Sequence, residues 1–305
     1  MFSYRHAFHA GNHADVLKHM VLVAMLDHLL EKDTALTVID THAGAGLYRL
    51  DGDYAGKSGE AAEGVLRLLS AIQAAEPPAP ALARYLDLVA SFNPRGQARI
   101  YPGSPFIAQH LLRPQDRLKL FELHPTDARA LAANVAQLEA GRRIAVLRED
   151  GFAGALPLLP PPSRRALVLC DPSYEIKSDY ARAAAFAAGA LKRFATGTLA
   201  VWHPIIPRPE AHALPRKLRT LAERLGRPWL HATLTVKSSR LRPGADGRTE
   251  RPGLPASGMF VFNPPWTLQA RLAPALPQLV RRLAQDRNAA FTLLAGGASA
   301  HPAAM

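Results

Sequence analysis

The amino-acid sequence predicts an α/β protein in which helices cover both faces of one seven-stranded, mostly parallel sheet. Apolar runs of strand length alternate along the chain with longer segments whose apolar residues recur at helical spacing, and this alternation is typical of a doubly wound sheet. Several of the runs end in an acidic residue or in a glycine turn. The carboxyl ends of the strands bind the ligand in open α/β sheets, so these endings also predict where a site lies.

The first elements follow from the N-terminal sequence. Residues 1–13 form a polar, aromatic arm, and Asn12 or Asp15 can cap the helix that comes next. Residues 35–40 are predicted to be a buried strand that runs into the turn at residues 41–46. The glycines of that turn let a ligand approach the backbone.

Residues 51–100 interrupt the alternation of strands and helices. Helical segments around residues 64–75 and 81–92 flank the proline-rich segment 76–80. We interpret residues 51–100 as a small helical subdomain inserted between the first and second strands. The main domain then consists of residues 1–50 and 101–288.

The alternation resumes after the insertion. Ser104 is predicted to cap a helix that has Pro105 in its first turn. The tail, residues 289–305, is rich in alanine and glycine and is expected to be loosely ordered. The other strands are expected at residues 118–122, 144–147, 167–170, 198–202, 231–236 and 258–262, and the other helices at 125–138, 180–194, 212–225 and 268–283.

Charge and composition favour a polyanionic partner and a reducing compartment. The formal net charge is +12, although composition alone does not establish nucleic-acid binding. The single cysteine excludes a disulfide framework, and the sequence has neither a signal-peptide pattern nor an apolar run long enough to span a bilayer. We therefore expect a cytoplasmic protein with no membrane partner. The histidines of the arm lack a nearby carboxylate or cysteine cluster, so we expect no metal site there.

The segment 238–256 is long, polar and basic. One interpretation is an exposed, solvated loop, and the other is a flexible flap that holds a phosphate backbone. The sequence leaves both open. The arginines of this segment are Arg240, Arg242, Arg248 and Arg251.

Four acidic residues follow predicted parallel strands: Asp40, Glu122, Asp150 and Asp171. Each could be a helix cap or a solvated turn residue. Four of them on one sheet edge, beside a glycine turn, favour a cofactor that contains a nucleoside. Glu122 is suited to accept hydrogen bonds from ribose hydroxyls. Asp150 is suited to accept from an adenine amine, with the backbone of Gly151 against the base.

The sequence Asp171-Pro172-Ser173-Tyr174 resembles the Asp-Pro-Pro-Tyr signature of methyltransferases that modify exocyclic amines of nucleic-acid bases. The Asp171 carboxylate and the Pro172 carbonyl would accept hydrogen bonds from the amine, and Asp171 would take its proton. Tyr174 would stack on the base, although a core aromatic is the alternative. Ser173 replaces the second proline and loosens this loop.

Taken as a whole, the chain resembles the bacterial 23S ribosomal RNA adenine-N6 methyltransferases of the RlmJ family nearly end to end. This resemblance implies a class I, Rossmann-like methyltransferase fold and S-adenosyl-L-methionine as cofactor. It also implies 23S ribosomal RNA as the partner of a monomeric enzyme. The blocks that carry the resemblance are residues 4–19, 40–46, 101–105, 122–125, 150–152, 171–174, 192–198 and 256–259.

Site residues follow from the resemblance, position by position. Tyr4 would contact the RNA. Two other functions remain open for the whole chain: an adenine-N6 DNA methyltransferase, and a non-catalytic RNA-binding or ribosome-assembly factor that kept the methyltransferase fold. The residues implied for the cofactor site are Lys18, His19, His42, Ser104, Glu122, Asp150, Gly151 and Asp171.

Overall fold

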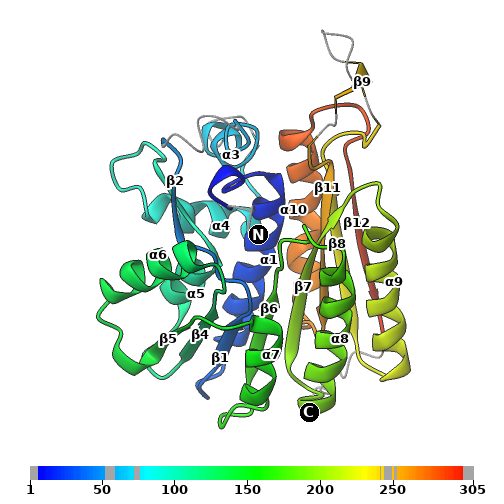
Figure 1. Ribbon diagram of the computed structural model, residues 1–305. Helices are drawn as coiled ribbons and strands as arrows, with labels where there is room; N and C mark the ends of the chain where they lie inside the picture. Colours follow the sequence, from blue (N-terminus) through cyan, green and yellow to red (C-terminus); the bar gives the residue numbers. More distant parts are fainter. Residues whose placement is uncertain are drawn as a thin grey trace, which may run out of the picture.

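The computed structural model describes residues 6–51, 59–71, 76–240, 242–243, 249–250 and 253–297. Its centre is an 8-stranded sheet with the order β12-β8-β11-β7-β6-β1-β4-β5, which Figure 1 shows from the side. Helices cover both faces of this sheet. The predicted α/β architecture is therefore confirmed, with one strand more than the sequence indicated.

One half of the sheet is parallel. β1 lies at its centre and pairs in parallel with β4 on one side and with β6 on the other. The strand order reverses around β1, so the carboxyl ends of β1 and β6 flank the topological switch point where such sheets bind ligands. The parallel strands are β1 (Thr37–Asp40), β4 (Arg117–Phe121), β5 (Ile144–Leu147), β6 (Ala166–Cys170) and β7 (Thr198–Ile205).

The other half of the sheet is antiparallel. β11 (Ala256–Phe262) lies between β7 and β8 (Trp229–Thr235) and is antiparallel to both. β12 (Ala290–Gly296) then pairs with β8. The expectation of a loosely ordered tail is therefore wrong for residues 290–296, which form this strand. Residues 298–305 lie outside the described part of the chain.

The reason for the error lies in the side chains of β12. Apolar and polar residues do not alternate in β12, which reads AFTLLAG, and most of its residues are exposed. The pairing depends instead on partners distant in sequence: the hydroxyls of Thr233 and Thr292 lie 2.7 Å apart, and a Cβ at Gly296 would come within 2.8 Å of the Trp229 ring. Such contacts cannot be read from local sequence.

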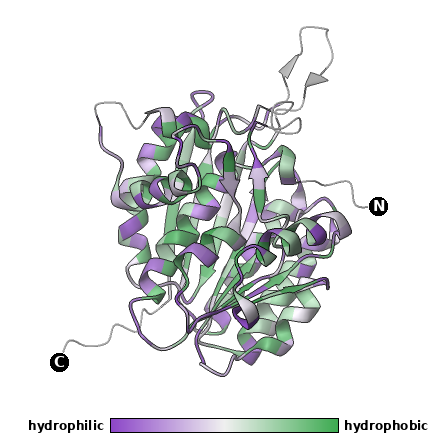
Figure 2. Ribbon diagram, turned by 90° about the vertical axis from the view of Figure 1, so that its left-hand side faces the viewer, coloured by the Kyte–Doolittle hydropathy of each residue, from purple (hydrophilic) through white to green (hydrophobic). Residues whose placement is uncertain are grey.

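Two hydrophobic clusters hold the helices on the sheet. The helices α1, α3, α4, α5, α6 and α10 pack on one face, and α7, α8 and α9 pack on the other. Figure 2 shows the hydrophobic strands between these two layers. The helices are α1 (His13–Leu29), α3 (Val65–Ala71), α4 (Pro80–Ser91), α5 (Ser104–Leu111), α6 (Pro125–Ala136), α7 (Gly151–Ala155), α8 (Ser178–Arg193), α9 (Pro209–Arg224) and α10 (Leu268–Leu283).

The first helix begins where the sequence indicated. Asn12 is its N-cap, because its side chain accepts hydrogen bonds from the backbone N–H groups of Ala14 and Asp15. Every residue from His13 to Leu26 is buried, since the sheet lies on one side of α1 and the helices α4, α5 and α10 lie around it. None of the described helices combines the length and the apolar character that a membrane span requires.

The insertion packs directly on this layer. The short antiparallel pair β2 (Leu47–Arg49) and β3 (Ile100–Pro102) closes its base. Its helix α4 packs against α1 and α10, and Val65 and Tyr85 are buried in the same hydrophobic cluster as α1 and the sheet. The inserted helices therefore share the main core, and the division into subdomains remains a prediction.

Candidate methyltransferase site

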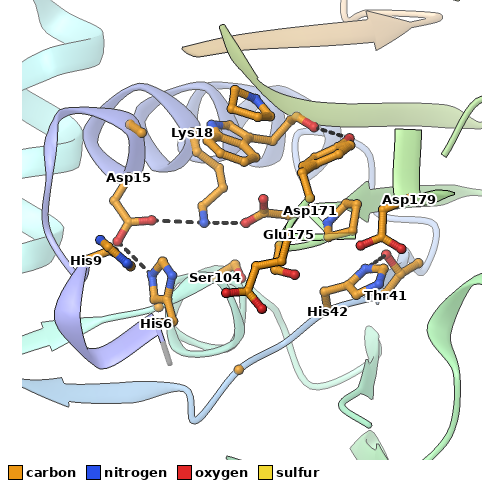
Figure 3. Close-up of a pocket in the computed structure, with 18 of the residues that line it drawn as sticks. His6, His9, Asp15, Lys18, Thr41, His42, Ser104, Asp171, Glu175 and Asp179 are labelled. Carbon is orange, nitrogen blue, oxygen red and sulfur yellow. Dashed lines mark hydrogen bonds and ion pairs between the residues drawn. The ribbon is translucent and has the colours of Figure 1, made fainter. Parts of the chain in front are cut away.

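A cavity of about 510 Å³ lies at the carboxyl ends of β1, β4, β6 and β7. Figure 3 shows side chains from α1, from the strand ends and from the loops pointing into it. Tyr4 lies outside the described residues, so its expected RNA contact is untested. Every other residue that the sequence assigned to the site lines the cavity: Lys18, His19, His42, Ser104, Glu122, Asp150, Gly151, Asp171 and Tyr174.

Asp171 stands at the end of β6 and forms an ion pair with Lys18 of α1. Lys18 Nζ lies 2.5 Å from Asp171 Oδ2 and 2.9 Å from Asp15 Oδ1 (Figure 3). Burial would lower the pKa of Lys18, but the two carboxylates outweigh burial and hold this pKa well above its ordinary value. The ammonium therefore stays charged and is directed at the carboxylate of Asp171.

Asp15 belongs to the site, and sequence reasoning missed it. Its Oδ2 lies 2.9 Å from His6 Nε2 and accepts a hydrogen bond of 2.9 Å from the backbone N–H of Gly11. Burial would raise the pKa of Asp15, but the charges of His6 and Lys18 hold it well below its ordinary value. Figure 3 shows Asp15 between Lys18 of α1 and His6 of the short helix η1 (His6–Phe8). The one available signal was the three-residue spacing of Asp15 and Lys18, which places both on one helix face.

Asp40 and Ser104 form a second buried pair. Ser104 Oγ donates to Asp40 Oδ2 at 2.6 Å, and the backbone N–H of His42 donates to Oδ1 at 3.2 Å. Burial raises the pKa of Asp40 to about 6 despite these donors. The prediction that Ser104 caps α5 is wrong: Gly103 is the N-cap, and the hydroxyl of Ser104 reaches across to β1 instead.

Glu122 supports the glycine turn after β1. It accepts hydrogen bonds from the backbone N–H groups of Gly44 at 2.8 Å and His124 at 2.7 Å. Burial raises the pKa of Glu122, and these two donors oppose that shift. Gly44 and Gly46 have φ values of +61° and +81°, a conformation that favours glycine. The turn therefore keeps its backbone open to the cavity.

Asp150 caps the short helix α7, which the sequence did not predict. Its Oδ1 accepts from the backbone N–H groups of Phe152 and Ala153, and its Oδ2 pairs with Arg182. Burial would raise the pKa of Asp150, but Arg182 lowers it overall. A Cβ at Gly151 would lie 1.9 Å from the carbonyl oxygen of Thr41, so only glycine allows α7 to start against the end of β1.

Tyr174 is held by contacts on its inner side. It has a φ of +55° and is 2% exposed. Its hydroxyl donates to the carbonyl of Trp202 at 2.7 Å, and Arg208 donates to the carbonyl of Tyr174 at 3.2 Å. The ring centroids of Tyr174 and Tyr180 are 4.6 Å apart. These contacts fix the loop although Ser173 replaces the second proline.

Two histidines line the cavity, of which His19 is buried and His42 is half-buried. The His42 ring packs edge-on against Phe152, with centroids 4.8 Å apart, and burial lowers the pKa of His42 to about 4. His19 Nδ1 lies 2.7 Å from the hydroxyl of Tyr101. Its other ring nitrogen, Nε2, is buried and has no hydrogen-bond partner among the described residues. A buried polar atom of this kind on a cavity wall favours a ligand as its partner.

The cavity fits a cofactor that joins a nucleoside to an amino acid. Glu122 and the glycine turn provide an acceptor and an accessible backbone on one side. His19 provides on the other side a ring nitrogen, Nε2, that has no partner among the described residues and suits an acidic group. In the parts of the chain given above, no group of three or more His, Cys, Asp or Glu side chains is arranged to hold a metal ion.

Comparisons with known proteins agree with this geometry. A family model described as "Ribosomal RNA large subunit methyltransferase D, RlmJ" matches residues 33–293. The chain is 42% identical to "Ribosomal RNA large subunit methyltransferase J" of Escherichia coli over 93% of its length and 94% of that protein. It is 40% identical to the protein of the same name from Haemophilus influenzae, over 96% of this chain and 98% of that one.

A solved structure has the same fold. The protein is from Legionella pneumophila, is 28% identical to this chain and superposes with a TM-score of 0.80 over 96% of this chain and 99% of that chain. The family match spans most of the sheet and reaches into β12. The chain belongs to the RlmJ family of ribosomal RNA large subunit methyltransferases.

Proposed function

We propose that this protein transfers a methyl group from S-adenosyl-L-methionine to the N6 amine of an adenine in 23S ribosomal RNA. The observation that carries the proposal is the position of Asp171, Pro172 and Tyr174, which line the cavity together at the end of β6. Family membership and the class I methyltransferase fold support the same reaction. The choice of large-subunit ribosomal RNA as the substrate follows from the names of the two relatives.

The chemistry of the amine explains why these residues are needed. The amine of adenine is a poor nucleophile because its lone pair is delocalised into the ring. The carboxylate of Asp171 and the carbonyl of Pro172 accept its N–H groups and favour a pyramidal nitrogen with a localised lone pair. Asp171 then accepts the proton that the amine loses. Lys18, 2.5 Å away, balances the charge of this carboxylate before the amine binds.

The remaining residues hold and orient the cofactor, which supplies a methyl group on an activated sulfonium sulfur. Glu122 is placed to bind ribose hydroxyls, and Gly151 lets the backbone approach the adenine. Asp150 is already bonded to α7 and Arg182, so its part in binding is to fix the helix start beside the base. Ser104, held by Asp40, and the neutral ring of His42 complete the wall. Orientation of this kind supplies a large share of the rate acceleration.

The substrate side of the proposal rests on charge and on Tyr174. A net charge of +12 suits an RNA partner. Tyr174 lines the cavity, and we propose that the target base stacks on its ring when RNA binds. Tyr4 is proposed as a further RNA contact. We expect the protein to act as a monomer in the cytoplasm, where ribosomal RNA is assembled in bacteria.

The test is methylation by the purified protein with labelled cofactor. Protein-free 23S RNA is expected to be labelled at an adenine N6, and duplex DNA and 16S RNA are not. Asp171→Asn keeps the shape of the side chain but not its basicity, so we expect a loss of 100-fold or more, in the range of about 10²–10⁴ for a proton acceptor.

Cofactor affinity measured by calorimetry should change by less than about threefold in Asp171→Asn, because the lost function is proton acceptance. Asp87→Asn, an exposed charge change on α4, is the matched control and should retain full activity. Equal rates for Asp171→Asn and the unchanged protein would refute the role of Asp171. Labelling of duplex DNA in preference to RNA would favour a DNA methyltransferase.

A further inference from the structure

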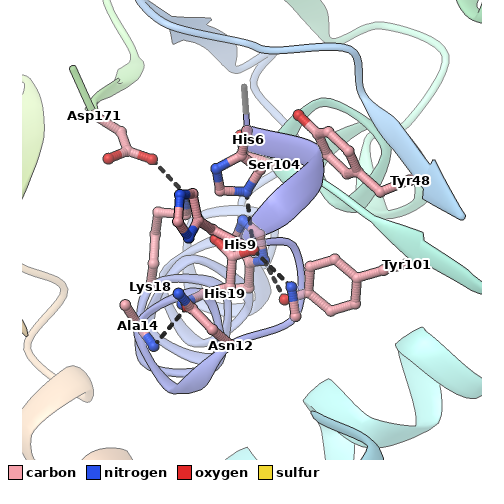
Figure 4. A network of polar contacts seen from close by, with 12 residues as sticks. His6, His9, Asn12, Ala14, Lys18, His19, Tyr48, Tyr101, Ser104 and Asp171 are labelled. Carbon is pink, nitrogen blue, oxygen red and sulfur yellow. Dashed lines mark hydrogen bonds and ion pairs between the residues drawn. The ribbon is translucent and has the colours of Figure 1, made fainter. Parts of the chain in front are cut away.

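Three residues from three elements form a buried hydrogen-bonded chain behind the cavity. His19 lies on α1, Tyr101 on β3 and Tyr85 on α4 of the insertion. His19 Nδ1 lies 2.7 Å from the Tyr101 hydroxyl, which lies 3.0 Å from the Tyr85 hydroxyl. All three side chains are 0% exposed. Figure 4 shows the His19 end of this chain beside Lys18 and Ser104.

We propose that Tyr85 and Tyr101 are positioning residues that fix His19 in the tautomer with the proton on Nε2, so that this N–H donates into the cavity to the carboxylate of the cofactor's amino-acid group. The proposal rests on the function proposed above for its ligand, but the tautomer itself does not depend on the reaction. Neither tyrosine lines the cavity. Both act only through His19.

The number of hydrogens available for bonding decides which of the three side chains donates and which accepts. If Tyr85 donates to Tyr101 and Tyr101 donates to His19 Nδ1, both hydroxyl hydrogens are bonded and the ring carries its proton on Nε2. If His19 instead donates from Nδ1, one of the two hydroxyl hydrogens is left without an acceptor in the core. The first arrangement leaves only the Nε2–H unbonded, and a ligand in the cavity can accept it. The second leaves both a hydroxyl hydrogen and the Nε2 lone pair unbonded. Each unbonded buried group costs about 1–3 kcal/mol, so the first arrangement is the stable one.

The ring must be neutral for this tautomer to be defined. Burial lowers the pKa of His19 well below its ordinary value, and Lys18 and His6 lower it further, while Asp15 opposes them. A neutral ring has one donor nitrogen and one acceptor nitrogen. Since Tyr101 occupies the acceptor, the donor faces the cavity and suits an anionic oxygen rather than a cation.

This arrangement gives the insertion a function. The cofactor wall is built from α1 and the strand ends, but the Tyr101 hydroxyl that orients His19 is itself oriented by Tyr85 of α4, 66 positions from His19 in sequence. The direction of the hydrogen bonds from Tyr85 to Tyr101 to His19 is set before any ligand binds. In binding sites, a partner on one ring nitrogen commonly orients a histidine whose other nitrogen contacts the ligand.

The direct test is nitrogen NMR of the full-length protein, labelled at histidine nitrogens and free of cofactor, near pH 7.5. The His19 signals are assigned from their loss in His19→Gln. The expected result is a proton directly bonded to Nε2 and an unprotonated Nδ1 in the unchanged protein. Tyr101→Phe should lose this preference and show a mixture of tautomers.

Kinetics supply the second measurement. Tyr101→Phe should raise the KM for S-adenosyl-L-methionine by about tenfold with kcat within about twofold, because an interaction that orients the bound cofactor is weakened. Tyr85→Phe should have a smaller effect in the same direction. The control is Thr233→Val, which removes a side-chain hydrogen bond between β8 and β12 and should leave both KM and the His19 tautomer unchanged.

Two results would overturn the proposal. One is a proton on Nδ1 of His19 in the unchanged protein. The other is an unaltered KM in Tyr101→Phe when the tautomer has changed. If methylation of RNA fails while Nε2 carries the proton, the proposed function is wrong and the tautomer assignment stands.

Discussion

At the scale of single residues, the site differs from the sequence prediction mainly in how the charges are paired. The acids at the strand ends and the Asp171 motif were predicted from sequence, because a buried run that ends in an acid has a local signature. The pairing of Lys18 with Asp171 was not, since 153 positions separate them and only the folded chain brings them together. The family resemblance placed Lys18 in the cofactor site; in the structure Lys18 contacts Asp171, the proposed proton acceptor.

Substitutions of Tyr174 test whether its ring stacks on the target base or only packs in the protein core. Tyr174→Phe loses the hydrogen bond to Trp202 and should lower the free energy of unfolding by about 1 kcal/mol with methylation nearly unchanged. Tyr174→Leu fills the space without an aromatic face, and the KM for RNA should rise at least tenfold, given about 1–3 kcal/mol per stacked base. Steady-state kinetics on both variants distinguish the roles: equal KM values would show that the ring only packs.

The buried Asp40 should make stability depend on pH. Its pKa is raised to about 6, whereas an unfolded aspartate titrates near about 3.9. Between these values the folded protein holds a proton that the unfolded chain has released, so stability is lost as pH rises from about 4 to about 6.

Asp40→Asn imitates the protonated acid and should remove this loss. Relative to the unchanged protein, the variant should gain about 3 kcal/mol between pH 4 and pH 7, from a shift of about two units. Urea unfolding at several pH values measures the difference. A difference that does not vary with pH would mean that Asp40 is ionised throughout.

At the scale of elements, the sequence located helices and strands well and their termini less well. The bounds of α10 were predicted to the residue, because its apolar positions repeat regularly. The short helix α7 was missed, since five residues carry no periodic pattern. The role of Ser104 was also mistaken, because a serine before a proline looks like a cap whether or not its hydroxyl is bonded elsewhere.

The start of α7 supports a prediction about Gly151. Gly151→Ala places a Cβ against the backbone of Thr41, so α7 must move away from β1. We expect the free energy of unfolding to fall by at least about 1–3 kcal/mol and the cofactor to bind more weakly. Gly189→Ala in α8 is the matched control, because its nearest neighbours are flexible atoms of Leu156 at 3.3 Å or more and alanine favours helix. Thermal unfolding and calorimetry should separate the two; similar behaviour would contradict the role of this close contact.

At the scale of the whole molecule, the sheet places the acids that the sequence identified on one edge. The parallel half was predictable because its strands are buried on both faces and read as continuous apolar runs. The last strand was not, since β12 is the exposed edge and depends on β8 for its pairing. The insertion was predicted because it interrupts the alternation of strands and helices, but the contacts of Tyr85 and Tyr101 with His19 emerge only in three dimensions.

The most direct measurement is a crystal structure of the protein with S-adenosylhomocysteine and adenosine monophosphate. We predict that the N6 amine lies within about 3.2 Å of both the Asp171 carboxylate and the Pro172 carbonyl, with the purine against Tyr174. A structure in which the adenine binds elsewhere and Asp171 contacts only Lys18 would contradict the account.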